Sequence, residues 1–140
     1  MRIKGHTIKE GCVEGEALVM TMAFSFLGDF DLTTGTVSDL HAQAGANISD
    51  KILVFPAGRG STTGALIGFY AGLFNTGPKG MICREAEPVI AINAVMNNIP
   101  MMDRLEMDPM EHIRTGDWVT LDASNRVVTV VKKKNMEKAG

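Results

Sequence analysis

The sequence is poor in the residue types that bind metals. Its 140 residues include two cysteines and three histidines. Cys12 and Cys83 are far apart and form no C-x-x-C pair, and no two histidines have the spacing of a metal site. An iron–sulfur cluster usually needs three or four thiolates, so we expect this chain to hold no metal or cluster alone. Both cysteines are expected to be small buried hydrophobic residues.

Long hydrophobic segments are also missing. The longest apolar stretch, residues 65–74, contains two glycines and is far shorter than the roughly 20 residues that span a membrane. The first residues lack the apolar core of a signal peptide. The formal net charge of −2 argues against a general attraction to nucleic acid. We therefore expect a cytoplasmic protein with no membrane or nucleic-acid partner, made of one domain over residues 1–131 and a basic, frayed tail over 132–140.

Hydrophobic patterns predict strands at both ends of the chain and alternating strands and helices between them. The expected strands cover residues 17–24, 51–55 and 80–84, with a short extended piece at 99–103, and the expected helices cover 65–74 and 89–98. Two alternating runs around Ser124-Asn125 predict a hairpin. The expected fold is an α/β domain with a mixed, barrel-like sheet and flanking helices. Four clustered methionines are expected to favour a subunit interface: Met101, Met102, Met107 and Met110.

A glycine-rich loop, Ala57–Gly64, lies between an expected strand and an expected helix. The first N–H groups of a helix have no partners within it, and the helix dipole adds positive potential there. Glycines at 58, 60 and 64 would let a ligand approach the backbone closely. Arg59 adds a planar fork that suits phosphate or carboxylate. The loop is therefore either an anion site or a flexible turn whose hydroxyls cap the helix.

Three specific readings of this loop differ in their support. The Walker A motif fails, because no lysine follows Gly64. A dinucleotide site remains open as a loose match, with Glu85 about 20 residues downstream. Alternatively, the positive potential at a helix start would favour the alkoxide of Ser61, which could then act as a base. No histidine adjoins Ser61, so a hydrolase triad has no support.

The motifs SFLGDFDLTTGTV, KILVFPAGRGSTTGA, NTGPKGMICREAEPVIAINAV, IPMMD and TGDWVTLDA follow one another in this order. The combination resembles the small subunit of the aconitase X family, the swivelling β/β/α domain of aconitase-like dehydratases, over roughly residues 14–123. Two departures affect the expected cleft. Gly28-Asp29 stands where the family often has a double glycine, and Thr63 stands where related aconitases have an arginine.

The resemblance implies a hydro-lyase subunit that is active only as a heterodimer. A large aconitase X subunit would carry the iron–sulfur cluster, and this chain would supply Ser61 as the catalytic base. Arg59, Gly60, Thr62 and Thr63 would line a small anionic hydroxy acid. Arg59 favours 5-phosphomevalonate over cis-3-hydroxy-L-proline, whose dehydratases usually lack the arginine. A nucleotide-binding module and a non-catalytic regulatory swivel domain remain as alternatives.

Overall fold

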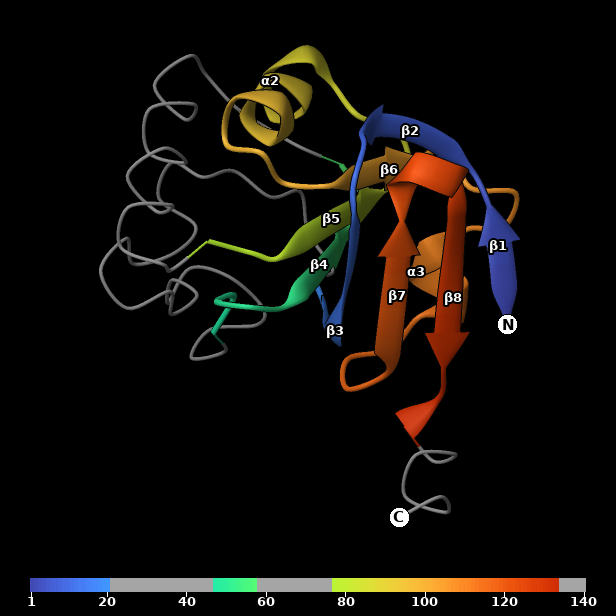
Figure 1. Cartoon of the computed structure of the whole chain (residues 1–140). Helices are drawn as coiled ribbons and strands as arrows, with labels where there is room; N and C mark the ends of the chain where they lie inside the picture. Colours follow the sequence, from blue (N-terminus) through green and yellow to red (C-terminus); the bar gives the residue numbers. More distant parts are fainter. Residues whose placement is uncertain (21–46, 58–76, 134–140) are drawn as a thin grey trace.

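The computed structural model describes residues 1–20, 47–57 and 77–133, which Figure 1 draws in colour. They contain eight strands in one sheet. The strands are β1 (Arg2–Lys4), β2 (His6–Lys9), β3 (Cys12–Val19), β4 (Ile52–Phe55), β5 (Gly80–Cys83), β6 (Met101–Asp103), β7 (Trp118–Asp122) and β8 (Val127–Val131). The helices are α2 (Pro88–Met96), α3 (Pro109–His112) and the 3₁₀ turn η1 (Ala123–Asn125). None of the helices in these ranges is long and apolar enough to cross a membrane.

The sheet closes on itself through its first two strands. The strand order is β1-β8-β7-β3-β4-β5-β6-β2, so the two outermost strands, β1 and β2, are consecutive and joined only by Gly5. The N–H of Gly5 donates to the carbonyl of Arg126 over 3.1 Å. A Cβ at this position would collide with Leu105 and lie 3.1 Å from the carbonyl of Asp103. Glycine therefore allows the chain to pass from one side of the barrel to the other.

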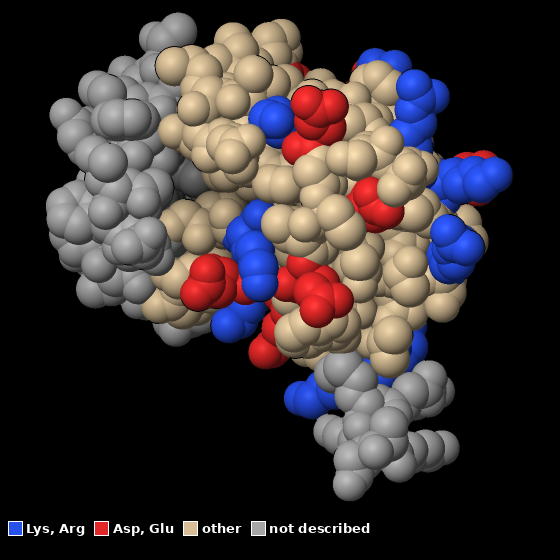
Figure 2. Space-filling model, viewed as in Figure 1, with Lys and Arg blue, Asp and Glu red and all other residues tan. Residues whose placement is uncertain are grey.

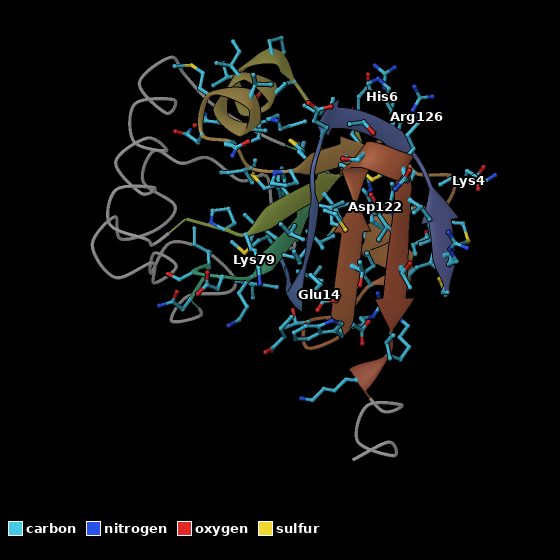
Figure 3. All side chains as sticks on the ribbon, in the orientation of Figure 1. Lys4, His6, Glu14, Lys79, Asp122 and Arg126 are labelled. Carbon is cyan, nitrogen blue, oxygen red and sulfur yellow. The ribbon has the colours of Figure 1, made fainter. Side chains whose placement is uncertain are left out.

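A side-chain contact secures the same junction. The Thr7 hydroxyl on β2 donates to the carbonyl of Ala123 in η1 over 2.5 Å. Figure 3 shows His6 and Arg126 projecting from this upper edge, where β2 meets the turn that leads into β8. Because β1 and β2 follow each other in the chain, they link the two ends of the strand order, as in a barrel. The barrel-like sheet expected from the sequence is confirmed.

The barrel has an antiparallel half and a parallel half that meet at β3. This strand pairs antiparallel with β7 on one side and parallel with β4 on the other. The pairs β4–β5 and β5–β6 are also parallel, whereas β1–β8, β7–β8 and β2–β6 are antiparallel. In Figure 1 the antiparallel strands β7 and β8 stand upright, and α2 lies beside the parallel half. Both kinds of pairing agree with the sequence-based expectation.

Alternating side chains divide the interior into two cores. Ile52 and Val54 of β4 point into the barrel, where they join apolar residues of β1, β3 and β5–β8. Leu53 and Phe55 point to the opposite face, where α2 covers them with Ile90 and other residues. All four residues of β4 are therefore buried, as expected for a strand covered on both faces. Each large side chain buried in this way contributes about 1.5–3 kcal/mol.

Helix α2 begins at a proline after a capping carboxylate. Pro88 is its first residue, and the side chain of Glu87 accepts hydrogen bonds from the N–H groups of Val89 and Ile90 over 2.8 and 2.5 Å. Proline has no N–H to leave unpaired at this position, and the carboxylate satisfies two helix donors. The cap fixes where α2 starts, immediately after the carboxyl end of β5.

Several sequence-based expectations need correction. Cys12 is exposed at the start of β3, although Cys83 is buried as expected. Met101 and Met102 are fully buried in the cores, and Met107 and Met110 pack against the barrel core, so this cluster fills the interior and forms no free interface. No strand was expected before residue 17, yet β1, β2 and the first part of β3 lie there. The expected helix at 65–74 lies outside the described residues.

A buried carboxylate fastens the end of β8 to the start of β7. Asp117 is 3% exposed and accepts hydrogen bonds from the N–H groups of Arg114 and Lys133, each over 2.9 Å. The ammonium group of Lys132 donates to the same carboxylate over 3.0 Å and to the carbonyl of His112. Burial by itself would raise the pKa of Asp117, but these donors outweigh it and lower the pKa below its ordinary value. At Lys132 and Lys133 the chain is therefore bound, whereas a frayed tail was expected.

The substitution Asp117→Asn is expected to lower the free energy of unfolding at pH 7 by about 1–3 kcal/mol, because it weakens a buried network. The folded pKa is depressed, so this stabilisation is complete above about pH 4 and is lost as the pH falls through the folded pKa. The difference between the variant and the wild type should therefore shrink below pH 4. Urea unfolding of the full-length chain at a series of pH values measures it.

Asp122→Asn is the matched control, since Asp122 ends β7, the strand that Asp117 precedes, and caps the turn η1, a role that asparagine also fills. An equal pH-dependent loss in both variants would contradict the role given to Asp117.

Candidate functional site

The parallel strands of the barrel end in one row. Val19 pairs with Val54, Phe55 pairs with Cys83, and Ile82 pairs with Met102. This register puts the carboxyl ends of β3, β4, β5 and β6 at one edge of the sheet, called here the carboxyl edge. Ligand sites of α/β sheets form at such edges, because the loops leaving neighbouring strands converge there.

The glycine-rich loop leaves the barrel from this edge. Pro56 and Ala57, which follow β4 directly, are half-buried. The residues predicted from the sequence to act at the site lie beyond them, outside the described residues. They are Arg59, Gly60, Ser61, Thr62 and Thr63. What the structure does fix is the place where their loop starts, beside the turn that follows β5 and on the same edge as the residue that follows β6.

A buried carboxylate holds that turn in place. Asp103, the last residue of β6, has a side chain only 2% exposed. One of its oxygens lies 2.7 Å from Nδ1 of His6, and the other accepts from the N–H of Ala86 over 2.9 Å. The carboxylate therefore ties together three separate parts of the chain: strand β2, strand β6 and the turn between β5 and α2. A buried carboxylate needs such partners to offset its lost hydration.

Arg104 follows Asp103 and lies across the same turn. Its N–H donates to the carbonyl of Arg84 over 2.8 Å, which extends the β5–β6 ladder by one residue. Its Nη2 lies 3.4 Å from a Glu85 oxygen, and its Nε lies 3.8 Å from an oxygen of Asp103. The backbone of Arg104 has a φ of +49°, in the left-handed region that is costly for most residues. The guanidinium group is thus directed from β6 over the end of β5.

Arg84 is engaged in a different direction. Its Nε lies 3.0 and 3.1 Å from the two oxygens of Asp108, and its Nη2 lies 3.0 Å from one of them. Asp108 also caps α3 by accepting from the N–H of Met110 over 2.9 Å. The hydrogen bonds from Arg84 lower the pKa of Asp108 below its ordinary value. All the side-chain contacts described for Arg84 therefore go to the segment that carries α3.

Cys83, the last residue of β5, lies under the carboxyl edge, and its buried thiol is expected to be unreactive. Burial, followed by the negative charges of Asp103, Glu87 and Glu85, raises the pKa of its thiol to about 12. The neutral thiol therefore predominates near neutral pH, and neither a nucleophile nor a metal ligand is poised there. The sequence-based preference for packing over chemistry at Cys83 agrees with this. Among the described residues no group of three or more His, Cys, Asp or Glu could hold a metal ion.

Helix α2 presents an uncharged surface beside the site. Ile92, Val95 and Met96 are 48%, 54% and 66% exposed, and with Ile8 and Ala91 they line a hollow of about 330 Å³. In Figure 2 the upper left of the described surface is mostly uncharged, with a basic and an acidic side chain beside it. Apolar surface gathered on one helix is typical of protein contact sites.

Taken together, the closed mixed sheet and the glycine-rich loop that starts at its carboxyl edge define an α/β domain with a candidate ligand site at that edge. Over residues 2–130 the sequence matches the aconitase X swivel domain family. The chain belongs to this family. A similar protein of Methanosarcina mazei, named phosphomevalonate dehydratase small subunit, is 39% identical over 95% of this chain and 93% of its own length. The protein of the same name from Methanocella arvoryzae is 43% identical, over 91% and 98%.

A solved structure has the same fold. The crystal structure of Thermococcus kodakaraensis aconitase X in its holo-form superposes with a TM-score of 0.87. It is 37% identical in sequence, and the match covers 94% of this chain and 99% of that one. The mixed α/β fold expected from the sequence is therefore confirmed by topology and by likeness to a family member.

Sequence analysis missed the residues that organise the carboxyl edge. Asp103 was noticed only as the end of an extended piece, although a polar residue at the carboxyl end of a buried strand is a recognisable signal of a site. The contact of Asp103 with His6 joins residues 97 positions apart in the sequence, and no local sequence pattern predicts such a pair. Glu85 was considered as a nucleotide-binding residue, and the structure instead places it against Arg104.

The substitution Asp103→Asn is expected to lower the free energy of unfolding by about 1–3 kcal/mol, because the buried site loses a charge-assisted bond to His6 or Ala86. Thermal and urea unfolding of the full-length chain measure this. Asp108→Asn is the control: its ion pair is more exposed, and asparagine still caps α3, so a much smaller change is expected. Equal losses would mean that burial of Asp103 has no special role.

Alkylation of the native chain with iodoacetamide at pH 8 is expected to modify Cys12 and leave Cys83 unmodified. Cys12 is exposed, whereas Cys83 is buried and its raised pKa leaves little thiolate. Peptide mass spectrometry before and after denaturation in urea reports the two sites separately. Rapid labelling of Cys83 in the folded chain would contradict the pKa shift.

Proposed function

We propose that this chain is the small subunit of a hydro-lyase that dehydrates (R)-5-phosphomevalonate to trans-anhydromevalonate 5-phosphate. The observation that carries the proposal is the combination of near full-length similarity to proteins named phosphomevalonate dehydratase small subunit with the G-R-G-S-T loop at the carboxyl edge. The fold supports it, because the loop starts where α/β sheets bind their ligands.

Ser61 is proposed to act as the catalytic base. Dehydration of a hydroxy acid removes a proton from one carbon and a hydroxide from its neighbour. If the sequence-predicted helix over residues 65–74 forms, Ser61 precedes its start, where positive potential would lower the free energy of the serine alkoxide. Arg59, Gly60, Thr62 and Thr63 would hold the anionic substrate against it through the guanidinium fork, the hydroxyls and the backbone.

The leaving hydroxide needs an electrophile that the described residues do not provide. Among them no cluster of metal-ligating side chains occurs, so an iron–sulfur cluster would be held by the partner. When bound there, it would act as the Lewis acid toward the hydroxyl that leaves. The work of this chain is to orient the substrate, to accept the proton and to exclude water.

A large partner subunit is therefore part of the proposal. The names of the relatives call them small subunits, which implies a larger one. The exposed apolar surface of α2 supports the presence of a partner, since a protein that works alone rarely leaves such a surface uncovered. A heterodimer is the simplest assembly that joins the loop and the cluster in one site.

A nucleotide-binding module is the main rival from another class of function. It would use Glu85 to bind a ribose, and in the structure this exposed carboxylate lies 3.4 Å from Nη2 of Arg104, a weak contact that a ligand could displace. The closed barrel also differs from the open sheet of a dinucleotide-binding domain. Calorimetric titration of the isolated chain with NAD and ATP separates the two, because the rival predicts binding without any partner.

The substitution Ser61→Ala is expected to lower kcat of the complex with its large subunit by at least about a hundredfold, which is the lower range for loss of a general base. The assay uses the two subunits co-expressed and purified without oxygen, and it follows water loss from 5-phosphomevalonate. Circular dichroism and gel filtration should show an intact fold and complex.

Ser124→Ala serves as the control, because the Ser124 hydroxyl only accepts a bond from the N–H of Gly11 in an exposed turn. Full activity of the Ser61→Ala complex would favour a non-catalytic regulatory domain. Turnover of cis-3-hydroxy-L-proline in place of phosphomevalonate would change the substrate and leave the reaction type intact.

A further inference from the structure

We propose that the outer face of the antiparallel half of the barrel is a contact surface between two copies of this chain. Strands β3, β7, β8 and β1 form this face, which is called here the antiparallel face. The proposal is independent of the dehydratase activity proposed above, because it concerns only how chains assemble.

The antiparallel face consists of three rows of side chains that point away from the barrel core. The strand registers place residues of neighbouring strands side by side in each row. From the lower to the upper end of β7 in Figure 1, the rows are Glu16, Trp118 and Val131; Glu14, Thr120, Thr129 and Arg2; and Cys12, Asp122, Val127 and Lys4. All of them are exposed or half-buried, whereas Val119, Val128 and Ile3, which alternate with them, are fully buried.

The described helices leave the antiparallel face uncovered. Helix α2 packs over Leu53 and Phe55 in the parallel half, and Figure 1 shows α3 behind β7 and β8. On the lower row Trp118 is 38% exposed, and Val131, its direct partner across the β7–β8 pair, is 41% exposed. Exposed tryptophan beside apolar neighbours is typical of the centre of a protein interface.

The two sides of the antiparallel face carry opposite charges. Glu14 and Glu16 are exposed on β3, and Arg2 and Lys4 are exposed on β1. In Figure 3 Glu14 and Lys4 lie on opposite sides of β7 and β8, and Figure 2 shows basic side chains along the right-hand margin. Three strand spacings, about 14 Å, separate β3 from β1, which exceeds the screening length of about 8 Å at physiological salt. The two sides therefore remain available to charges on another molecule.

A two-fold axis parallel to the strands makes the antiparallel face complementary to itself. Rotation about this axis brings a second copy face to face with the first and exchanges its two sides, so β3 of each copy lies over β1 of the other. Glu14 then opposes the second copy's Arg2. Two sheets packed in this way lie about 10 Å apart with their strands aligned within about 30°.

The other residues of the face also match under this rotation. Trp118 opposes the second copy's Val131, and Thr120 opposes the second copy's Thr129. A two-fold axis across the strands would instead place Glu14 against the second copy's Glu14, which like charges disfavour. The charges therefore select one of the two possible face-to-face arrangements.

The mixture of charges favours a second copy over a different partner. An acidic partner would be repelled by the β3 side, and a basic partner by the β1 side, whereas a second copy carries both signs in matching positions. The face has eleven residues a side, fewer than the roughly 20–30 of a standard interface, so we expect a dimer that dissociates on dilution. The exposed surface of α2 lies outside this contact.

Charge exchange between Glu14 and Arg2 tests the arrangement, with sedimentation equilibrium of the full-length chain on the order of 10 µM to 1 mM as the measurement. The wild type is expected to pass from monomer to dimer. Glu14→Lys and Arg2→Glu should each raise the dimer Kd by at least about tenfold, because each opposes like charges at two symmetry-related places. The double variant recreates both pairs with their signs exchanged, and its Kd should return to within about threefold of the wild type.

Two further variants separate the contact from a general effect of charge. Trp118→Ala is expected to raise the dimer Kd by at least about tenfold, since it removes the largest apolar group of the face. Glu111→Lys makes the same change of charge as Glu14→Lys but on α3, and its Kd should stay within about twofold of the wild type. Circular dichroism checks that each variant is folded.

Several results would overturn the proposal. A wild-type chain that is monomeric over the whole concentration range would do so, as would an unchanged Kd in Glu14→Lys or a double variant that remains as weak as the single ones. A tighter dimer in Glu14→Lys would mean the other two-fold axis. If the complex with the large subunit contains one copy of each chain and Glu14→Lys dissociates it, the face belongs to the large subunit. Because these measurements follow mass and not turnover, an inactive complex would overturn the proposed function and leave this one standing.

Discussion

Parallel main-chain pairing of β4, β5 and β6 brings the described parts of the candidate site to one edge. Phe55 and Cys83 pair directly, and the ladder continues through Arg84 and Arg104 beyond the last strand residues. A shift of this register by one residue would exchange the two faces of a strand, so Leu53 would lose its core on the α2 side. Because β4 is buried on both faces, the hydrophobic cores fix the register and therefore fix the edge.

Asp103 shows how the fold connects stability to the geometry of the site. A carboxylate with 2% of its side chain exposed is costly unless hydrogen bonds replace its water, and here His6 and the N–H of Ala86 do so. An apolar residue could have filled this position at the end of β6. The carboxylate instead orders the turn between β5 and α2, which lies against the start of the glycine-rich loop. Asp103 therefore serves to position the turn between β5 and α2. The surrounding barrel offsets the free-energy cost of burying its carboxylate.

Local patterns in the sequence predicted the centre of the fold and missed its closure. The apolar runs of β4 and β5 and the Glu87-Pro88 helix start are short-range signals, and each appeared at its expected place. Strands β1 and β2 carry few apolar residues and form only because distant partners, β8 and β6, complete their pairing. The same reason hid Asp103: the expected chemistry of Ser61 could be read locally, whereas Asp103 acquires its structural role only through contacts with His6 and Ala86.

The arrangement of charges explains why such a domain would work only with a partner. Around the carboxyl edge the described carboxylates of Asp103, Glu85 and Asp108 are all engaged with basic groups of the same chain. In the proposed function the glycine-rich loop would hold the anionic substrate, but hydrogen-bond donors and an arginine do not supply the Lewis acid that a departing hydroxide needs. In the proposed reaction that step needs an electrophile, which another subunit would bring to the carboxyl edge from outside.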